Sequence, residues 1–249
     1  MKKIFAIAAM AAMLIACGDN GEQNNPNPNP GTIPGGEVEV TTDITIDGNF
    51  EDWNGLEGVS VVTLGTDGTY SDTDLKTLKL YADELSINIY AEYDPTVAMV
   101  LCCHMDVDGD ANTGRSVPFA GVDIYMEGSI YEWSTNEAGD TFVEQIGGVA
   151  WNPGIYEYAG EDGSDAWGWN ELLEGGLANG SVPAAVDGGL AAVEVQIMRE
   201  MIPLALGESV SIMVGITNSG WDQSGILPQI SLEAEEAGET PVALTVTLP

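Results

Sequence analysis

A polar segment of the chain, MDVDGDANTGRS at residues 105–116, places an oxygen-bearing side chain at every second position. These side chains belong to Asp106, Asp108, Asp110 and Asn112. Calcium binds six to eight oxygen ligands at about 2.4 Å, and carboxylates at alternate positions of a tight loop can converge on one ion. The pattern therefore favours a calcium site that pins the loop between two strands, because every candidate ligand is an oxygen atom. The alternative is a solvated turn whose side chains cap nearby backbone N–H groups.

The loop is similar to known calcium loops but does not follow the EF-hand order. An EF-hand has glycine at its sixth position and a bidentate glutamate at its twelfth. Counted from Asp106, Gly109 stands at the fourth position and Val117 at the twelfth. Gly109 still lets the backbone turn sharply. We expect a structural role for such a site and no catalytic one.

Histidine and cysteine residues give a weaker indication of a metal. His104 is the one histidine in the sequence, and it shares a predicted strand face with Cys102 and Asp106. Three residues on one strand face lie nearly in line and do not surround a zinc ion without help, so we interpret His104 as a partly exposed strand residue. We expect Cys103 in the core, Cys102 on the other face and both thiols free, because direct pairing of neighbouring cysteines needs a strained geometry.

The sequence carries no strong sign of an enzyme. A single histidine leaves no clear Ser-His-Asp arrangement, and the sequence has no G-x-S-x-G motif. With 40 acidic residues, no glycosidase-like pair of carboxylates stands out. We therefore predict a protein that is not an enzyme. A haem- or metal-carrying electron-transfer module is a remote alternative, which the single histidine weakens.

Aromatic residues are the stronger lead to function. Four of the six tryptophans fall between residues 133 and 169, in a stretch rich in Gly, Asn and Asp where we expect loops. Sugars present apolar C–H faces and hydroxyl rims, so their sites combine aromatic rings with carboxylates and amides. The alternative is that tryptophans fill the core, where we place Trp53, whereas we expect Trp221 to plug a loop end. The predicted sugar-contacting residues are Trp133, Trp151, Tyr156, Tyr158, Trp167 and Trp169, with Asn152, Glu161, Asp165 and Asn170 as a polar rim.

The elements that position these residues are predicted to be β-strands. Short runs from residue 38 onward alternate apolar and polar side chains and are broken by Gly, Asn, Asp and Pro. The pattern predicts an all-β fold, an antiparallel, jelly-roll-like β-sandwich with at most one or two short helical turns. The predicted segments are a hairpin at 77–94, a strand at 97–107, a hairpin at 121–135 turning at Glu127-Gly128, strands within 190–200, 209–218 and 241–248, and a helical turn within 198–206.

The first residues predict an exported lipoprotein. MKKIFAIAAMAAMLIAC joins two lysines to an apolar run that is too short to span a bilayer as a helix. Its end, LIAC, resembles a bacterial lipobox, which implies cleavage before Cys17 and acylation of that cysteine. The acidic residues that follow resemble the surface-export signal of glycan-foraging Gram-negative bacteria. We expect a cell-surface protein anchored in the outer membrane through Cys17, with an ordinary signal peptide as the alternative.

Composition suggests the domain boundaries and excludes one class of partner. Residues 18–36 form an Asn/Pro/Gly-rich linker without apolar periodicity, between a signal peptide at 1–17 and a single β-sandwich domain at 37–249. All 40 acidic residues but only four of the six basic ones follow Cys17, which leaves an excess of 36 negative charges. Such a chain repels phosphate backbones, so we expect no nucleic-acid partner.

Several segments resemble, in order, sandwich domains related to family 9 carbohydrate-binding modules and to DOMON-type domains. The resemblance implies that Asp123 returns from the next strand to complete the cation shell. Many members of these families bind sugars and some bind haem, so the resemblance leaves function open. The segments are ITIDGNFEDWNG at 44–55, KLYADELSINIYAEYD at 79–94, MDVDGDANTG followed by GVDIYMEG, and VEVQIMREMIPLALGESVSIMVGITNSGW at 193–221.

These observations together predict a surface lipoprotein that binds a polysaccharide or oligosaccharide without cleaving it, through a calcium-stabilised β-sandwich. The alternative is an accessory surface subunit that docks on a transporter or an enzyme and contacts no glycan. The two differ in what they expose, because a glycan binder needs solvent-facing aromatic rings whereas a docking subunit needs an apolar patch.

Overall fold

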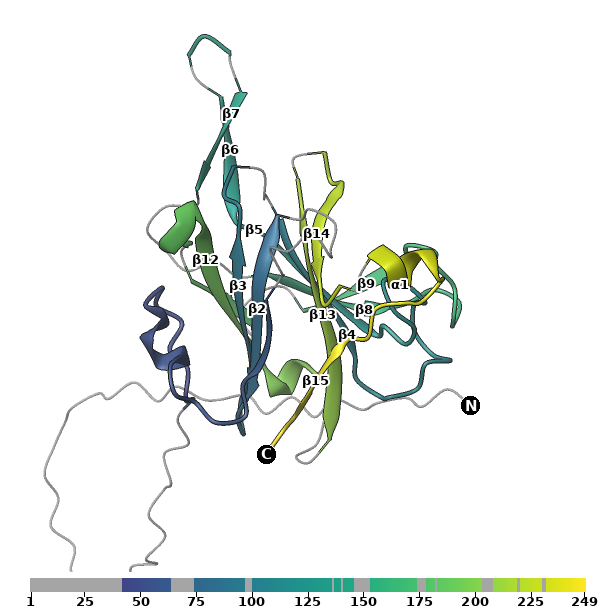
Figure 1. Cartoon of the computed structure of the whole chain (residues 1–249). Helices are drawn as coiled ribbons and strands as arrows, with labels where there is room; N and C mark the ends of the chain where they lie inside the picture. Colours follow the sequence, from purple (N-terminus) through teal and green to yellow (C-terminus); the bar gives the residue numbers. More distant parts are fainter. Residues whose placement is uncertain are drawn as a thin grey trace, which may run out of the picture. The chain divides into compact units, whose positions relative to one another are not determined.

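The computed structural model describes most of the chain from residue 42 onward (Figure 1). The chain divides into two units, Met1–Val38 and Glu39–Pro249, and the described residues belong to the second. The predicted signal peptide, the lipidation site at Cys17 and the linker at 18–36 lie outside the described residues. The description covers 42–63, 74–96, 100–135, 137–139, 141–145, 153–173, 178–181, 183–202, 208–218, 220–229 and 232–249, with the backbone alone for 131–135, 141–145, Leu173, Met201, Leu232 and Glu235.

Two large antiparallel sheets form the fold, as the sequence predicted. The first sheet has the order β1-β2-β3-β12-β10, with β11 also paired to β12, and the second has the order β14-β13-β4-β5-β8-β9, with β15 also paired to β13. The strands of the first sheet are β1 (Ser60–Thr63), β2 (Leu75–Ala82), β3 (Ser86–Tyr93), β10 (Ala178–Gly180), β11 (Ala184–Ala185) and β12 (Ala191–Met198). Those of the second are β4 (Val100–Asp106), β5 (Ile124–Ser129), β8 (Gly154–Tyr158), β9 (Trp169–Leu173), β13 (Ser209–Thr217), β14 (Gln223–Leu227) and β15 (Leu244–Thr247).

One apolar core joins the two sheets into a sandwich. It includes Ile89 of β3 and Val195 of β12 from the first sheet, and Met105 of β4 and Val214 of β13 from the second. All four side chains are inaccessible to solvent. Alternate residues of each strand point into this core because side chains on a strand alternate between its two faces.

Strand β4 is buried on both faces, and this property defines the region of interest. Cys103 belongs to the central core, whereas Cys102 lies on the opposite, outer face in a smaller cluster with Val100 and Tyr125. Both thiols are free, as expected, and both are buried. The outer face of β4 is therefore covered by a second layer of side chains, whose aromatic members come from β5, β8 and β9.

The DGNFEDW segment covers the outer face of the first sheet. Its 3-10 turn η1 (Phe50–Trp53) places Trp53 in a cluster with Tyr90, and Trp53 is 3% exposed, so its predicted burial is confirmed. The Glu194 carboxylate on β12 is fully buried and accepts hydrogen bonds from Asp47 N at 2.9 Å, Gly48 N at 2.8 Å and Trp53 Nε1 at 3.0 Å. The segment is thus fixed to the sheet by one buried carboxylate.

Two details differ from the sequence-based expectation. The hairpin turn expected at Glu127-Gly128 is wrong, because β5 continues to Ser129 while paired with both β4 and β8. The chain then forms a separate two-stranded sheet of β6 (Tyr131–Thr135) and β7 (Thr141–Gln145). The helical turns also exceed the expected one or two: beside η1 they are η2 (Asp187–Gly189), η3 (Arg199–Met201) and the five-residue α1 (Leu232–Glu236), of which η3 lies within the predicted 198–206.

Among the described residues, no helix is long and apolar enough to cross a membrane.

Candidate functional site

Three acidic side chains converge where β4 ends and β5 begins. Asp106, Asp108 and Asp123 each offer a carboxylate oxygen, and these oxygens lie within 4.8 Å of one another. Two ligands on opposite sides of a calcium ion are about 4.8 Å apart, since each lies at about 2.4 Å from it. The all-oxygen donor set and its spacing therefore fit a hard cation such as calcium.

The electrostatics of this cluster also suit a cation. Burial, and then the nearby charges of Asp108 and Asp106, raise the pKa of Asp123 to about 7, although the Val107 N–H group opposes the shift from 3.0 Å. Burial likewise raises the pKa of Asp106, with Asp108 and Asp110 as further causes. The carboxylates are thus crowded and partly desolvated, and a positive ion between them would relieve their repulsion.

Asp110 is absent from this cluster of acidic side chains, and Asn112 binds Asp110. Asp110 Oδ1 accepts hydrogen bonds from the Asn112 backbone N at 3.0 Å and from Asn112 Nδ2 at 2.7 Å, so these two predicted ligands bind each other. Asp123, which was implied by the family resemblance, does join the group. Among the described residues, Cys102 and His104 belong to no such cluster.

The loop between β4 and β5, residues 107–123, is called the acidic loop and is attached to a second loop that precedes β9. Ser116 N donates to Ser164 O at 2.9 Å, and Gly163 N donates to Gly114 O at 2.8 Å. The Arg115 guanidinium donates to Asp165 O through Nε at 3.2 Å and Nη2 at 3.0 Å, and to Val117 O through Nη1 at 3.0 Å. These contacts fix the loop that carries the exposed Trp167.

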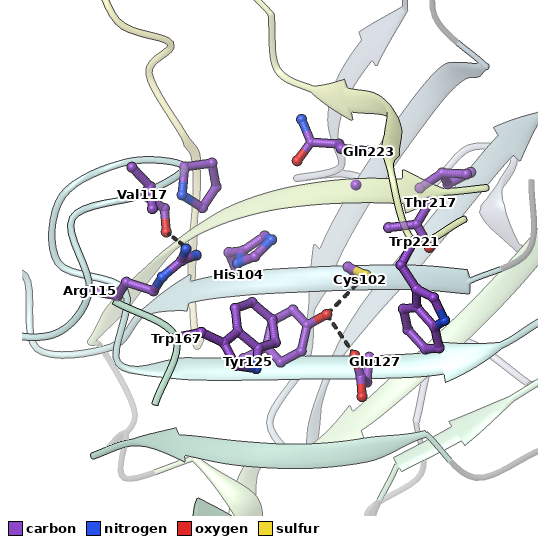
Figure 2. A pocket seen from close by; sticks show the side chains of 13 residues that line it. Cys102, His104, Arg115, Val117, Tyr125, Glu127, Trp167, Thr217, Trp221 and Gln223 are labelled. Carbon is purple, nitrogen blue, oxygen red and sulfur yellow. Dashed lines mark hydrogen bonds between the residues drawn. The ribbon is translucent and has the colours of Figure 1, made fainter. Parts of the chain in front are cut away.

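A pocket of about 730 Å³ opens on the outer face of the second sheet, beside this loop (Figure 2). Its floor is made by side chains of β4, β5 and β13, where His104 lies directly opposite Tyr125, and Cys102 opposite Glu127 and Gly215, in the strand pairing. The lining residues are Cys102, His104, Arg115, Val117, Pro118, Tyr125, Glu127, Trp167, Gly215, Ile216, Thr217, Trp221 and Gln223.

Two exposed tryptophans lie at opposite ends of the pocket in Figure 2. Trp167 is 63% exposed and has the Arg115 guanidinium carbon 5.2 Å from its ring centre, while Trp221 is 65% exposed. The expectation that Trp221 plugs a loop end is wrong, since its indole lines the pocket. It lies in the β13–β14 turn with φ +64°, a left-handed conformation that is uncommon for residues other than glycine. Asn218 holds this turn, because its Oδ1 accepts from Gly220 N at 2.8 Å and from Asp222 N at 3.1 Å.

His104 is a neutral group on the pocket floor. Only 6% of it is exposed, so the expected partial exposure is wrong, and its ring centre lies 5.0 Å from that of Tyr125. Burial, with the Arg115 charge as a smaller cause, lowers the pKa of His104 to about 3. Its Nδ1 is buried and has no hydrogen-bond partner among the described residues. The imidazole therefore supplies polarity to the pocket without charge.

Tyr125 and Glu127 provide the other polar groups of the floor. The Tyr125 hydroxyl lies 2.8 Å from Glu127 Oε2 and 3.1 Å from Cys102 Sγ, as the dashed lines of Figure 2 show. Burial raises the pKa of Tyr125 well above its usual value, and it raises that of the Cys102 thiol to about 12. Both groups therefore remain protonated at neutral pH, and Cys102 is an unreactive thiol.

A second hollow of about 370 Å³ adjoins the first and shares Tyr125, Glu127 and Trp167 with it. Tyr156, Gly168 and Trp169 complete its lining. Tyr158, which was also predicted to contact sugar, lies behind Trp169 with ring centres 5.3 Å apart and lines neither hollow. Of the other predicted aromatics, Trp133 is described by its backbone alone, and Trp151, like the rim residue Asn152, lies outside the described residues.

Sequence reasoning missed most of the pocket floor and one of its walls. His104, Tyr125, Glu127, Gln223 and Trp221 all line the pocket, and none was predicted to contact a ligand. One signal was present in the sequence. His104 and Tyr125 lie two residues from Asp106 and Asp123, so they share the strand faces of the predicted cation ligands.

Comparison with known proteins adds a resemblance of overall fold. No protein-family model and no curated protein matches the chain. Among solved structures, the chain is similar to a family 9 carbohydrate-binding module from Caldicellulosiruptor kristjanssonii in complex with cellotriose, with a TM-score of 0.38, 12% identity, and coverage of 82% of this chain and 89% of that chain. It is also similar to a family 9 module from the same organism in complex with glucose, with a TM-score of 0.36, 14% identity, and coverage of 83% and 91%. This is the family that the sequence segments resemble, and the choice of a ligand for this chain rests on its own site.

Proposed function

We propose that the chain binds carbohydrate without cleaving it, in the pocket between Trp167 and Trp221. The observation that carries the proposal is the pair of exposed indoles, 63% and 65% accessible, at the two ends of a pocket of about 730 Å³. Two exposed tryptophans that flank a polar floor suit a ring with apolar faces and hydroxyl edges. The volume falls in the range of about 300–1,000 Å³ that is typical of small-molecule sites.

The polar groups of the floor suit hydroxyl groups better than charged ones. His104 is neutral. Arg115 and Glu127 bring one positive and one negative charge to the lining. A neutral ligand with several hydroxyls can donate to one of these groups and accept from another, which supports a sugar over an ionic ligand.

The same lining supports binding rather than hydrolysis. Most glycosidases use two carboxyl groups that flank the scissile bond. Among the described residues that line the pocket, Glu127 is the one carboxylate. His104 cannot replace the second acid or base at neutral pH, because its pKa is about 3.

We also propose that calcium occupies the cluster of Asp106, Asp108 and Asp123. The ion would bind the two strand ends and hold the acidic loop in place. That loop carries Arg115 and Val117 of the pocket wall and contacts the loop that bears Trp167. Calcium would thus support the sugar site by positioning its walls, without contact between ion and sugar.

For location, we propose a lipoprotein anchored at Cys17 in the outer membrane and exposed at the cell surface. The lipobox-like LIAC, the acidic residues after it and the linker at 18–36 support this proposal. A polar linker of this length would hold the sandwich some distance from the lipid surface, where a polysaccharide is accessible.

Native gel electrophoresis with soluble polysaccharides embedded in the gel tests the sugar proposal. We expect one class of polysaccharide to retard the wild-type protein, and we expect Trp167→Ala to migrate as it does in an empty gel. Val242→Ala is the matched control, because Val242 is 80% exposed and does not line the pocket. Equal retardation of Trp167→Ala and wild type would contradict the site, and no retardation by plant, microbial or host glycans would favour the accessory docking subunit.

A further inference from the structure

The smaller hollow on the outer face of the second sheet continues the pocket across the strands, toward β8 and β9. The two cavities have Tyr125, Glu127 and Trp167 in common, so they adjoin at these three side chains. The smaller one extends over β8 and β9, which follow β5 in the sheet order. A ligand that fills the pocket can therefore extend past Trp167 without leaving the protein surface.

Aromatic rings form the base of this hollow. The ring centre of Trp169 lies 5.2 Å from that of Tyr125, with the two ring planes inclined by 30°. It lies 5.8 Å from the ring centre of Trp167, with the ring planes at 73°. Tyr156 lies along its strand above Gly154, because a Cβ atom at Gly154 would be 2.6 Å from the Tyr156 hydroxyl oxygen. The Tyr156 side chain is partly exposed and lines the hollow. The arrangement gives a platform of the kind that stacks against the C–H face of a sugar.

Polar atoms at the edge of the platform are available to a ligand. No hydrogen bond is seen for the Tyr156 hydroxyl among the described residues, whereas the Tyr158 hydroxyl on the same strand lies 3.2 Å from Glu161 O. Glu127 lines both cavities and uses Oε2 to accept from Tyr125. These groups would bind hydroxyls of a sugar that lies on the platform.

We propose that the smaller hollow is a second sugar-binding compartment, so that the protein recognises an oligosaccharide of at least two units that passes Trp167 and Glu127. This inference rests on the proposed function, since it assigns one sugar unit to the pocket and the next to the platform of Tyr156 and Trp169. Its volume of about 370 Å³ lies within the range of ligand sites, which runs from about 300 to 1,000 Å³. The substrate class is therefore a chain and not a free monosaccharide.

Isothermal titration calorimetry with sugar ladders tests this inference on full-length protein in detergent micelles. The probes are β-1,4-linked glucose, xylose and mannose and α-1,4-linked glucose, each from one to six units. In one ladder we expect affinity to rise about tenfold from one unit to two or three, since one additional stacking contact contributes about 1–1.5 kcal/mol. We expect no comparable gain beyond the length that fills both compartments.

Two variants assign that gain to the smaller hollow. Tyr156→Ala removes part of the platform, and Gly168→Leu fills the cavity from a position where a Cβ meets only ordinary contacts, at 3.5 Å and 3.6 Å from Gly160. Each should reduce the gain with chain length to less than about threefold and leave monosaccharide affinity within about twofold of wild type. Tyr156→Phe and Gly168→Ala are the matched controls and should keep most of the gain, which also guards against misfolding of either larger change.

The outcomes separate the two proposals. If the wild type binds a monosaccharide as tightly as its oligomers, or if Tyr156→Ala and Gly168→Leu weaken every chain length equally, the second compartment is refuted while sugar binding stands. If no ladder and no polysaccharide binds the wild type, the proposed function fails, and the second compartment fails with it.

Discussion

Replacing Trp221 with glycine separates sugar binding from folding at a single position. The residue has φ +64°, and a left-handed backbone costs an L-residue about 1–2 kcal/mol that glycine does not incur. Its indole is 65% exposed, so little packing is lost with the ring. We therefore expect Trp221→Gly to be as stable as wild type or more stable by about 1 kcal/mol, which in a domain of this size raises Tm by about 2–4 °C.

Binding should respond in the opposite direction. Loss of one aromatic wall removes a stacking contact and the apolar area that it covers, and a central aromatic of this kind contributes about 2 kcal/mol. The expected result is a Kd about 30-fold weaker for an oligosaccharide that fills the pocket. Calorimetric titration gives the affinity, and differential scanning calorimetry gives Tm from the same preparation.

Trp221→Ala completes the comparison, because it loses the ring but keeps the left-handed backbone. We expect it to lose binding as Trp221→Gly does, without the gain in stability. A Kd for Trp221→Gly within about threefold of wild type would remove Trp221 from the site. A fall in Tm of more than about 5 °C would show instead that the indole supports the fold.

Three further results are expected. In a chelator, the stability of the fold should decrease as pH rises from about 4 to 7. Burial, and then Asp108 and Asp106, raise the pKa of Asp123 from 3.8 to about 7, so the folded state keeps a proton that the unfolded state loses. Scanning calorimetry should show that Asp123→Asn flattens this pH dependence and abolishes the rise in Tm with calcium, and an unchanged pH dependence would count against the cluster. Glu194→Gln should destabilise the domain by about 1–3 kcal/mol in urea unfolding, because the amide NH₂ of the glutamine would face N–H donors such as Trp53 Nε1. An unaltered unfolding midpoint would contradict the conclusion that this carboxylate fixes the DGNFEDW segment to the sheet. With calcium held at a saturating concentration, so that the acidic cluster does not titrate, sugar affinity should stay constant from pH 5 to 8 because the pKa of His104 is about 3. A step near pH 6.5 under these conditions would show that the imidazole is charged there.

The sequence predicted the sandwich because burial leaves a simple pattern in the strands. Leu101, Cys103 and Met105 alternate along β4, and all three are inaccessible to solvent in the core. The turn at Glu127-Gly128 was misplaced for a physical reason. A Glu-Gly pair favours a turn locally, but here the strand is held between β4 and β8, so the neighbouring strands override the local preference.

The candidate site was predictable only in part. Clustering of aromatic residues drew attention to Trp167, Trp169 and Tyr156, which the fold does gather on one face of the second sheet. Trp221 lies more than fifty residues further along the chain, and only the pairing of β13 with β4 and β14 brings its turn to the pocket. His104 was also misjudged, because strand alternation gives the face of a side chain but not the layer that covers that face.

The cation ligands show the same limit at closer range. Spacing at alternate positions predicted Asp106, Asp108, Asp110 and Asn112 as one set, but alternate residues converge only while the loop keeps one curvature. Asp110 lies outside the acidic cluster and its Oδ1 accepts hydrogen bonds from Asn112. Such local capping competes with metal ligation and leaves no distinct mark in the sequence.

A glycan array probed with the wild-type protein and Trp221→Gly, both in millimolar calcium, tests the central claim most directly. The account predicts reproducible binding of the wild type to one class of polysaccharide and none by the variant at the same concentration. Binding by both proteins would place the sugar elsewhere on the molecule. A blank array for the wild type, over plant, microbial and host glycans, would contradict carbohydrate binding itself.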